Sequence, residues 1–237
     1  MAILGTALRR VRTAPLSAAS GGVRVDVVKA LFIGSLDALD VALDVALAEL
    51  EGHASPRVCV VATAAAFRGP VAAIEEVEEP LARRRADVVT LTVLDRASAN
   101  DPDVVAIVVA SDLVILCDGA VLHARSVWRH SLLGEELSRS SLLCVGATGS
   151  VLGATMIDPR GGAPTTGLGL FDDVVLGVHA SAEQSQRTRD LLVRETLVEL
   201  GPRSMVAYDG AWRVLDGRDL EVTRAGVAVD LGLGDGQ

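Results

Sequence analysis

The sequence is poor in aromatic residues and almost free of lysine. Only 3% of its 237 residues are Phe, Trp or Tyr, although 50% are hydrophobic. A core of this composition must be built from Val, Leu, Ile and Ala, which is typical of parallel sheets buried on both faces. Lys29 is the only lysine, and the arginines are scattered among acids. With a net charge of −9 the chain lacks the clustered positive surface that nucleic-acid binding needs.

Long apolar runs and paired cysteines are also missing. No apolar run reaches about 18 residues, so we expect no membrane-spanning helix. Cys59, Cys117 and Cys144 each lie inside an apolar run, and their odd number and spacing fit neither a disulfide nor a metal site. We therefore expect buried thiols in a reducing, cytoplasmic protein that carries no metal and no cofactor.

The first 24 residues differ from the rest of the chain. They contain four arginines and no acid, as targeting peptides do, but the apolar core of a signal peptide is absent. We interpret residues 1–24 as a flexible extension. The alternative is a short amphipathic helix that docks on a partner or an anionic surface. Residues 25–237 are then expected to form a single α/β domain.

Beyond residue 25, short apolar runs alternate with helical patterns, which predicts βαβ units and a parallel sheet. Predicted strands cover residues 25–34, 57–64, 87–94, 112–117, 140–145 and 172–180. Predicted helices cover 36–51, 71–85 with an interruption near Pro80, a helix capped by Asn100-Asp101-Pro102, 121–137 and 181–200. Residues 158–169 are expected to be a loop. Asp209-Gly210 predicts a closing hairpin. The expected fold is a three-layer sandwich with a mostly parallel sheet.

A glycine-rich turn, GATGSVLG (146–153), follows the fifth predicted strand. Ligands of open α/β sheets bind outside the carboxyl ends of the strands, so this turn is a candidate site. It is similar to dinucleotide-binding turns, but those follow the first strand, and the glycine spacing here is one residue too long. The same strand, sharp turn and helix also frame a nucleophile elbow. Dinucleotide binding stays a hypothesis, ranked third behind the two that are given below.

Four segments decide between these interpretations: VATAAAFRGP (61–70), DGAVLHARSVWRHSLLGEEL (118–137), MIDPRGG (156–162) and GLGL (167–170). Together they resemble cyanophycinase-like proteins of the peptidase E (dipeptidase E) family, over about residues 30–217. LHARSV and DPRGG are the most specific pieces. The resemblance implies a flavodoxin-like fold similar to class I glutamine amidotransferases. It also implies a serine elbow written S-A-G-A, an oxyanion site of backbone amides, a histidine and an acid.

This chain departs from that pattern at the nucleophile, at the glycine pair and at the acid, whereas His179 could match the histidine. Counting back from MIDPRGG places Gly146 where the serine belongs, and a shifted register brings in Thr148 or Ser150 outside a G-x-S-x-G frame. The expected glycine pair is Asp118-Gly119, and an aspartate beside a developing oxyanion is unfavourable. Where the acid is expected, the chain has Arg203, which cannot orient a histidine.

The sequence therefore predicts a degenerate, non-catalytic member of this family that acts as a binding or assembly module. The alternative is an active peptidase or isopeptidase that uses Thr148 or Ser150 with His179. We expect a remnant pocket that takes a peptide or a carboxylate, and a homodimer or a heteromer with an active relative. The residues expected to line the pocket are Gly119, Ala120, Gly146 and Arg160.

Overall fold

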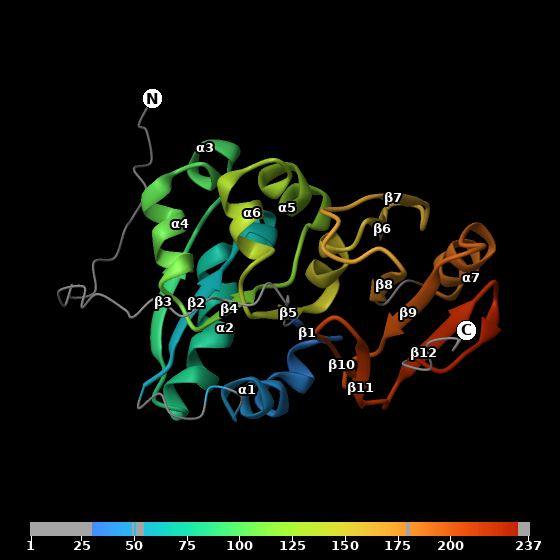
Figure 1. Cartoon of the computed structure of the whole chain (residues 1–237), viewed down its shortest axis with the longest axis horizontal. Helices are drawn as coiled ribbons and strands as arrows, with labels where there is room; N and C mark the ends of the chain where they lie inside the picture. The colour runs from blue at the N-terminus through green and yellow to red at the C-terminus, as the bar shows by residue number, and fades with distance from the viewer. Residues whose placement is uncertain (1–29, 49, 51–54, 179–180, 232–237) are drawn as a thin grey trace.

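A computed structural model describes residues 30–48, 50, 55–178 and 181–231 (Figure 1). Its largest feature is a seven-stranded sheet in the order β11-β10-β1-β5-β4-β2-β3. The five strands from β1 to β3 in that order pair in parallel, and β10 lies antiparallel beside β1. The mostly parallel α/β sheet predicted from the sequence is therefore confirmed. The strands are β1 (Ala30–Ile33), β2 (Arg57–Val61), β3 (Asp87–Leu91), β4 (Leu113–Leu116), β5 (Leu142–Val145), β10 (Met205–Tyr208) and β11 (Trp212–Asp216).

Helices cover both faces of this sheet, because successive side chains of each strand point to opposite sides. Leu31 and Ile33 pack in the cluster formed with α1 (Leu39–Ala48) and α2 (Pro70–Arg83), whereas Phe32 belongs to the cluster on the other face. Figure 1 shows α1 and α2 on one side of the sheet and four other helices, α3 to α6, on the opposite side. Those helices are α3 (Arg96–Ala99), α4 (Pro102–Val109), α5 (Val121–Trp128) and α6 (Leu132–Leu137).

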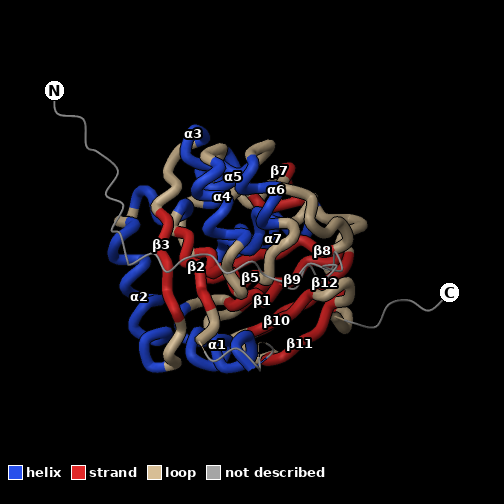
Figure 2. The backbone as a smooth tube through the Cα atoms, turned by 60° about the vertical axis from the view of Figure 1, so that its left-hand side comes forward, coloured by secondary structure: helices blue, strands red, loops and turns tan. Residues whose placement is uncertain are grey.

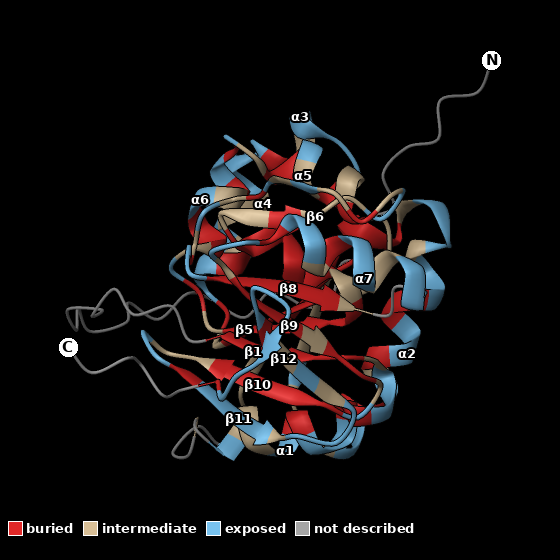
Figure 3. Ribbon diagram, turned by 90° about the vertical axis from the view of Figure 1, so that its right-hand side faces the viewer, coloured by how far each residue is buried: buried red, intermediate tan, exposed pale blue. Residues whose placement is uncertain are grey.

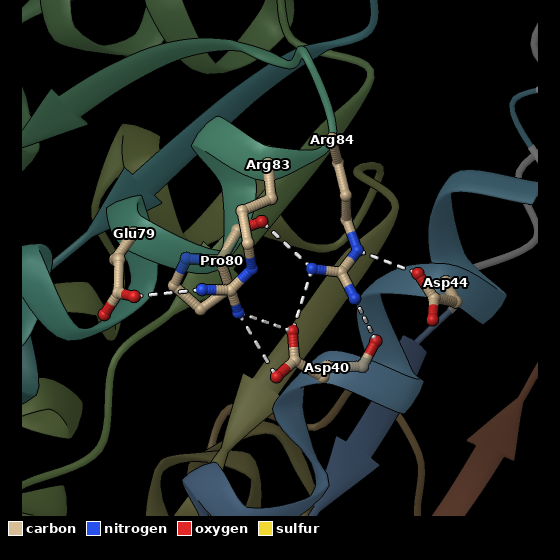
Figure 4. A network of polar contacts seen from close by, with 6 residues as sticks. All are labelled: Asp40, Asp44, Glu79, Pro80, Arg83 and Arg84. Atoms are coloured by element: carbon tan, nitrogen blue, oxygen red, sulfur yellow. Dashed lines mark hydrogen bonds and ion pairs between the residues drawn. The ribbon is translucent and has the colours of Figure 1, made fainter.

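Helix α2 continues through Pro80, so the predicted interruption there is wrong. A proline inside a helix removes one backbone donor and crowds the preceding turn. Here the proline ring is buried with the apolar face of the helix, and this burial offsets the lost hydrogen bond. The next turn is held by Arg84, which donates to the Pro80 carbonyl at 2.9 Å (Figure 4). Arg83 and Arg84 also pair with Asp40 of α1, and their hydrogen bonds lower the pKa of that carboxyl.

Residues 121–137 form two helices instead of the single predicted helix. The chain breaks after Trp128, and His130 takes a left-handed conformation with φ of 57°. Ser131 then starts α6 by accepting a hydrogen bond from the Gly134 amide at 3.1 Å, which is a common N-cap. A local cap and a left-handed residue thus override the continuous helical pattern of the sequence.

A second sheet has the order β13-β12-β9-β8, and of its strands the sequence predicted only β8, within residues 172–180. The predicted helix 181–200 is wrong beyond Leu191, because only residues 182–191 are helical and residues 196–200 form a strand. That strand pairs on both sides, with β8 in parallel and with β12 antiparallel. These long-range pairs are invisible to local periodicity. The elements are β8 (Val174–Val178), α7 (Ala182–Leu191), β9 (Thr196–Leu200), β12 (Leu220–Arg224) and β13 (Val227–Ala228).

Two short connections also differ in detail from their predictions. The loop expected at 158–169 contains a strand, β7 (Pro164–Thr166), which pairs with β6 (Thr155–Ile157). The β10–β11 hairpin is present, but Tyr208 pairs with Trp212, so three residues connect the strands instead of two. Gly210 in this turn has φ of 96°, a conformation that a glycine adopts without strain. Figure 2 shows the hairpin at the edge of the large sheet.

Burial is concentrated in the strands of the large sheet and on the inner faces of its helices (Figure 3). The three cysteines are buried and unpaired, as predicted. Burial raises the pKa of the Cys59 and Cys117 thiols to about 12. Such thiols stay protonated near neutral pH and behave as small apolar side chains. Over the described ranges, no helix combines the length and apolarity needed to cross a membrane.

Candidate functional site

The order of the parallel strands places a switch point at the carboxyl ends of β2 and β4. The chain leaves β2 toward the edge strand β3, whereas it leaves β4 in the opposite direction toward β5. Ligands of open α/β sheets bind at such a switch point. The two loops meet closely here: the Ala120 amide donates to the Ala64 carbonyl at 2.6 Å, and Arg68 Nε donates to the Asp118 carbonyl at 3.2 Å.

Gly119 is required for this close approach. Its φ is 152°, and a Cβ atom there would lie 2.2 Å from the Ala64 carbonyl oxygen. Only glycine combines that backbone conformation with the absence of a side chain. The loop after β2 continues as a 3-10 helix, η2 (Thr63–Phe67), whose first residue accepts a hydrogen bond from the Trp128 indole at 3.1 Å. Helix α5 is therefore anchored to the loop after β2.

A sharp turn follows β5 at Gly146, where η3 (Gly146–Leu152) begins. Gly146 has φ of 60°, the left-handed conformation that costs about 1–2 kcal/mol for most other residues. A Cβ atom on Gly146 would lie 2.3 Å from Asp118 Cγ, with both carboxylate oxygens within 2.5 Å. The space that a side chain at the apex of the turn needs is therefore filled by the Asp118 carboxylate.

The Asp118 carboxylate is held by two backbone amides. Its Oδ1 accepts from the Gly119 amide at 2.8 Å and from the Ala147 amide at 2.9 Å. Burial raises the pKa of Asp118, while these two hydrogen bonds and the charge of Arg68 act in the opposite direction. The amide pair that the sequence suggested as an anion site thus contacts an anion that belongs to the protein.

The hydroxyls of Thr148 and Ser150 are both bound to backbone carbonyls. Thr148 is fully buried and donates to the Cys117 carbonyl at 2.8 Å. Ser150 is 5% exposed and donates to the Ala147 carbonyl at 2.7 Å. His179, the third candidate, lies outside the described residues, directly after Val178 at the end of β8.

The remaining predicted residues are divided between two places. Ala120 precedes α5 and, with Gly119 and Gly146, lies in the turns that follow β4 and β5. Arg160 is exposed in a different turn, where its backbone amide donates to Asp158 Oδ1 at 2.9 Å. Arg203, at the position expected for the acid, is exposed and lies 3.9 Å from Asp219. The structure thus joins the glycine and aspartate positions, whereas the contacts that Arg160 and Arg203 make are with Asp158 and Asp219.

The glycines of the turn after β5 also have a packing role. A Cβ atom on Gly149 would lie 2.6 Å from the Phe32 ring, and one on Gly153 would lie 2.9 Å from the Phe171 ring. Both rings belong to a cluster with Tyr208 and Trp212, whose ring centroids lie 4.9–5.8 Å apart in contacting pairs. The glycine spacing that suggested a phosphate-binding turn therefore matches close packing of η3 against aromatic rings.

Sequence reasoning missed a pocket of about 100 Å³ beside this turn. Its walls come from η3, the start of α5, the turn 157–162, α7 and the strands β8 and β9. The MIDPRGG motif marked one wall, but the wall from β9 was hidden because residues 196–200 were predicted to be helical. Among the described residues, no group of three His, Cys, Asp or Glu side chains could hold a metal ion.

Comparisons with known proteins support the fold. No family model and no curated protein matches the sequence. The solved structure of a peptidase from an acI-B1 actinobacterium is similar with a TM-score of 0.64 and 16% identity, over 86% of this chain and 97% of that one. A putative peptidase E protein from Listeria monocytogenes EGD-e gives a TM-score of 0.56 and 12% identity, over 84% and 98%. The chain therefore has the α/β fold of peptidase E structures.

Proposed function

We propose that this chain is a non-catalytic protein on a peptidase E-like fold that acts as a binding or assembly module. The observation that carries the proposal is the position of Asp118. Its carboxylate lies where a side chain on Gly146 would project, and it occupies the Gly119 and Ala147 amides. One residue therefore fills the places that a nucleophile and an oxyanion would need.

Electrostatics adds to this argument. Acyl transfer requires donors that stabilise a negative charge as it develops on the substrate oxygen. The amide after the nucleophile is a usual member of that donor set. Here the corresponding Ala147 amide already bonds to a carboxylate at 2.9 Å. A second negative charge at this place would be repelled, because like charges at close range disfavour each other.

The alternative hydrolase that uses Thr148 or Ser150 is less well supported. A nucleophilic hydroxyl must donate its proton to a base, yet both of these hydroxyls donate to backbone carbonyls. Thr148 is also fully buried, so a substrate carbonyl has no access to it. Dinucleotide binding is disfavoured in turn, because Gly149 and Gly153 pack against aromatic rings instead of leaving room for a pyrophosphate.

The proposal is tested by activity and by covalent labelling. Purified protein is incubated with acidic and arginine-containing dipeptides, and separately with a fluorophosphonate probe followed by mass spectrometry. We expect no turnover above a heat-denatured control and no adduct. Stoichiometric labelling of Thr148 or Ser150, abolished in Thr148→Val or Ser150→Ala, would overturn the proposal. Assembly as a homodimer or with an active relative remains a prediction that light scattering on the purified chain tests separately.

A further inference from the structure

The pocket beside η3 combines an apolar wall with a polar rim. Val121, Ala147, Ile157, Leu176 and Val178 supply the apolar part. Ser150, Asp158, Gln184, Thr188 and Glu199 supply the polar part. Small-molecule sites in proteins are usually built this way, with an apolar lining and a few polar groups that fix the orientation of the ligand.

The hydroxyl hydrogens at this rim are already used inside the protein. Ser150 donates to the Ala147 carbonyl at 2.7 Å, and Thr188 donates to the Gly162 carbonyl at 2.8 Å. A hydroxyl has one hydrogen and two lone pairs, so each of these oxygens can only accept a further hydrogen bond. Gln184 uses one amide hydrogen on the Pro159 carbonyl at 3.3 Å. The rim is therefore rich in acceptors and poor in donors.

The charges at the rim favour a ligand of positive sign. Glu199 accepts two hydrogen bonds from Arg189, at 2.9 and 2.6 Å, and Arg189 also binds Glu221 at 2.6 Å. This trio carries one net negative charge, to which Asp158 adds a second. Arg160 contacts Asp158 through its backbone amide and does not line the pocket. Hydrogen bonds between an ionised donor and a carboxylate are among the strongest in proteins.

Acceptor lone pairs, two carboxylates and an apolar wall select one kind of ligand. From this geometry, and resting on the binding role proposed above, we infer that the pocket binds a small protonated amine on a short apolar stem. The ammonium group donates to Asp158 and Glu199, with the hydroxyl oxygens of Ser150 and Thr188 as further acceptors. The stem lies against Ile157, which packs on the same face of the β8–β9 pair as Glu199. A volume of about 100 Å³ fits an amine of only a few heavy atoms.

Titration calorimetry with three probes of similar size tests this inference: propylammonium, neutral propanol and anionic propionate. We expect saturable binding of propylammonium alone. Asp158→Asn and Glu199→Gln should each weaken it by about tenfold, because each removes a charged acceptor while keeping the shape of the side chain. Glu183→Gln is the matched control, since Glu183 is exposed on α7 and does not line the pocket. Its affinity should equal that of the unmodified chain.

Equal affinity for propionate, or no saturable binding of propylammonium, would overturn the inference. So would an equal loss in Glu183→Gln, which would indicate attraction by the overall negative charge. Circular dichroism checks that each variant is folded. If Glu199→Gln loses its structure with the Arg189 contacts, Asp158→Asn carries the test alone. Peptide turnover would overturn the non-catalytic proposal without touching amine binding, whereas an inert protein that ignores amines would overturn only this inference.

Discussion

The turn after β5 has two sides, and they are built on opposite principles. On the side of β4, the backbone amides of Gly119 and Ala147 are occupied by the Asp118 carboxylate. On the side of β8, the hydroxyls of Ser150 and Thr188 donate to backbone carbonyls, and their oxygens can still accept hydrogen bonds in the pocket that they line. One side is internally satisfied, and the other retains unused acceptors. The comparison teaches that a turn can have its nucleophile and oxyanion positions filled while the adjacent pocket wall can still bind a ligand.

The largest effect is expected when a side chain is placed at Gly146, in the space that the Asp118 carboxylate occupies. Gly146→Ala should reduce the free energy of unfolding by about 3 kcal/mol, because it combines a left-handed alanine with a clash against Asp118. Asp118→Gly in the same chain removes the clash, so the double variant should recover about 2 kcal/mol of that loss. Urea unfolding of the four proteins in this cycle measures the coupling. Strictly additive effects would show that the carboxylate does not occupy the space above Gly146.

Removing the hydroxyl of Thr148 or of Ser150 should have a smaller effect on stability, and only the Ser150 variant should change binding in the pocket. Thr148→Val and Ser150→Ala each remove a hydroxyl that is bonded to a carbonyl, so each should cost about 1 kcal/mol in unfolding free energy. Only Ser150 lines the pocket. We therefore expect about twofold weaker binding of propylammonium in Ser150→Ala and unchanged binding in Thr148→Val. Equal affinities in the two variants would remove Ser150 from the proposed rim.

The smallest effect concerns the pH dependence of stability. Because burial raises the pKa of Asp118 in the folded chain, ionisation of this group favours the unfolded chain. Protonated Asp118 therefore stabilises the folded chain fully below pH 3.8, the ordinary pKa of an aspartate. This stabilisation is lost as the pH rises through the raised pKa of the folded chain. Asp118→Asn keeps an oxygen acceptor and removes the charge, so its stability relative to the unmodified chain should increase over that window.

Urea midpoints from pH 3 to 7 measure this difference, with Glu183→Gln as the control for removing an exposed carboxyl. If the difference in unfolding free energy between Asp118→Asn and the unmodified chain is constant across this pH range, the pKa of Asp118 is the same in the folded and the unfolded chain. A difference that falls with rising pH would mean that the two amides outweigh burial and hold the carboxylate in its charged form.

The sequence predicted the large sheet well, because its strands β1 to β4 are apolar runs that are each followed by a helical pattern. Asp101 shows how local chemistry helped: it caps α4 by accepting from the Asp103 amide, just before Pro102, as expected. The sequence failed where partners are distant. Residues 196–200 gain their structure from β8 and β12, and no local pattern distinguishes them from a continuation of α7.

The same division holds for the candidate site. The spacing between GATGSVLG and MIDPRGG pointed to Gly146, and the glycine pair expected after the fourth strand pointed to Asp118. The contact between the Asp118 carboxylate and the Gly146 position depends on how β4 and β5 lie side by side, which only the folded sheet defines. The amine pocket was out of reach for a similar reason, because Glu199 and Thr188 reach it from elements that were predicted as one helix.

The scarcity of aromatic rings has a practical consequence for spectroscopy. The chain has two tryptophans, and they report on different parts of the molecule. Trp128 is fully buried in the helical layer beside η2, whereas Trp212 lies at the edge of the large sheet, 4.9 Å from both the Phe171 and Tyr208 rings. Replacing either one with phenylalanine leaves a single tryptophan as the reporter. The protein therefore carries its own pair of optical reporters, one for the helical layer and one for the hairpin edge.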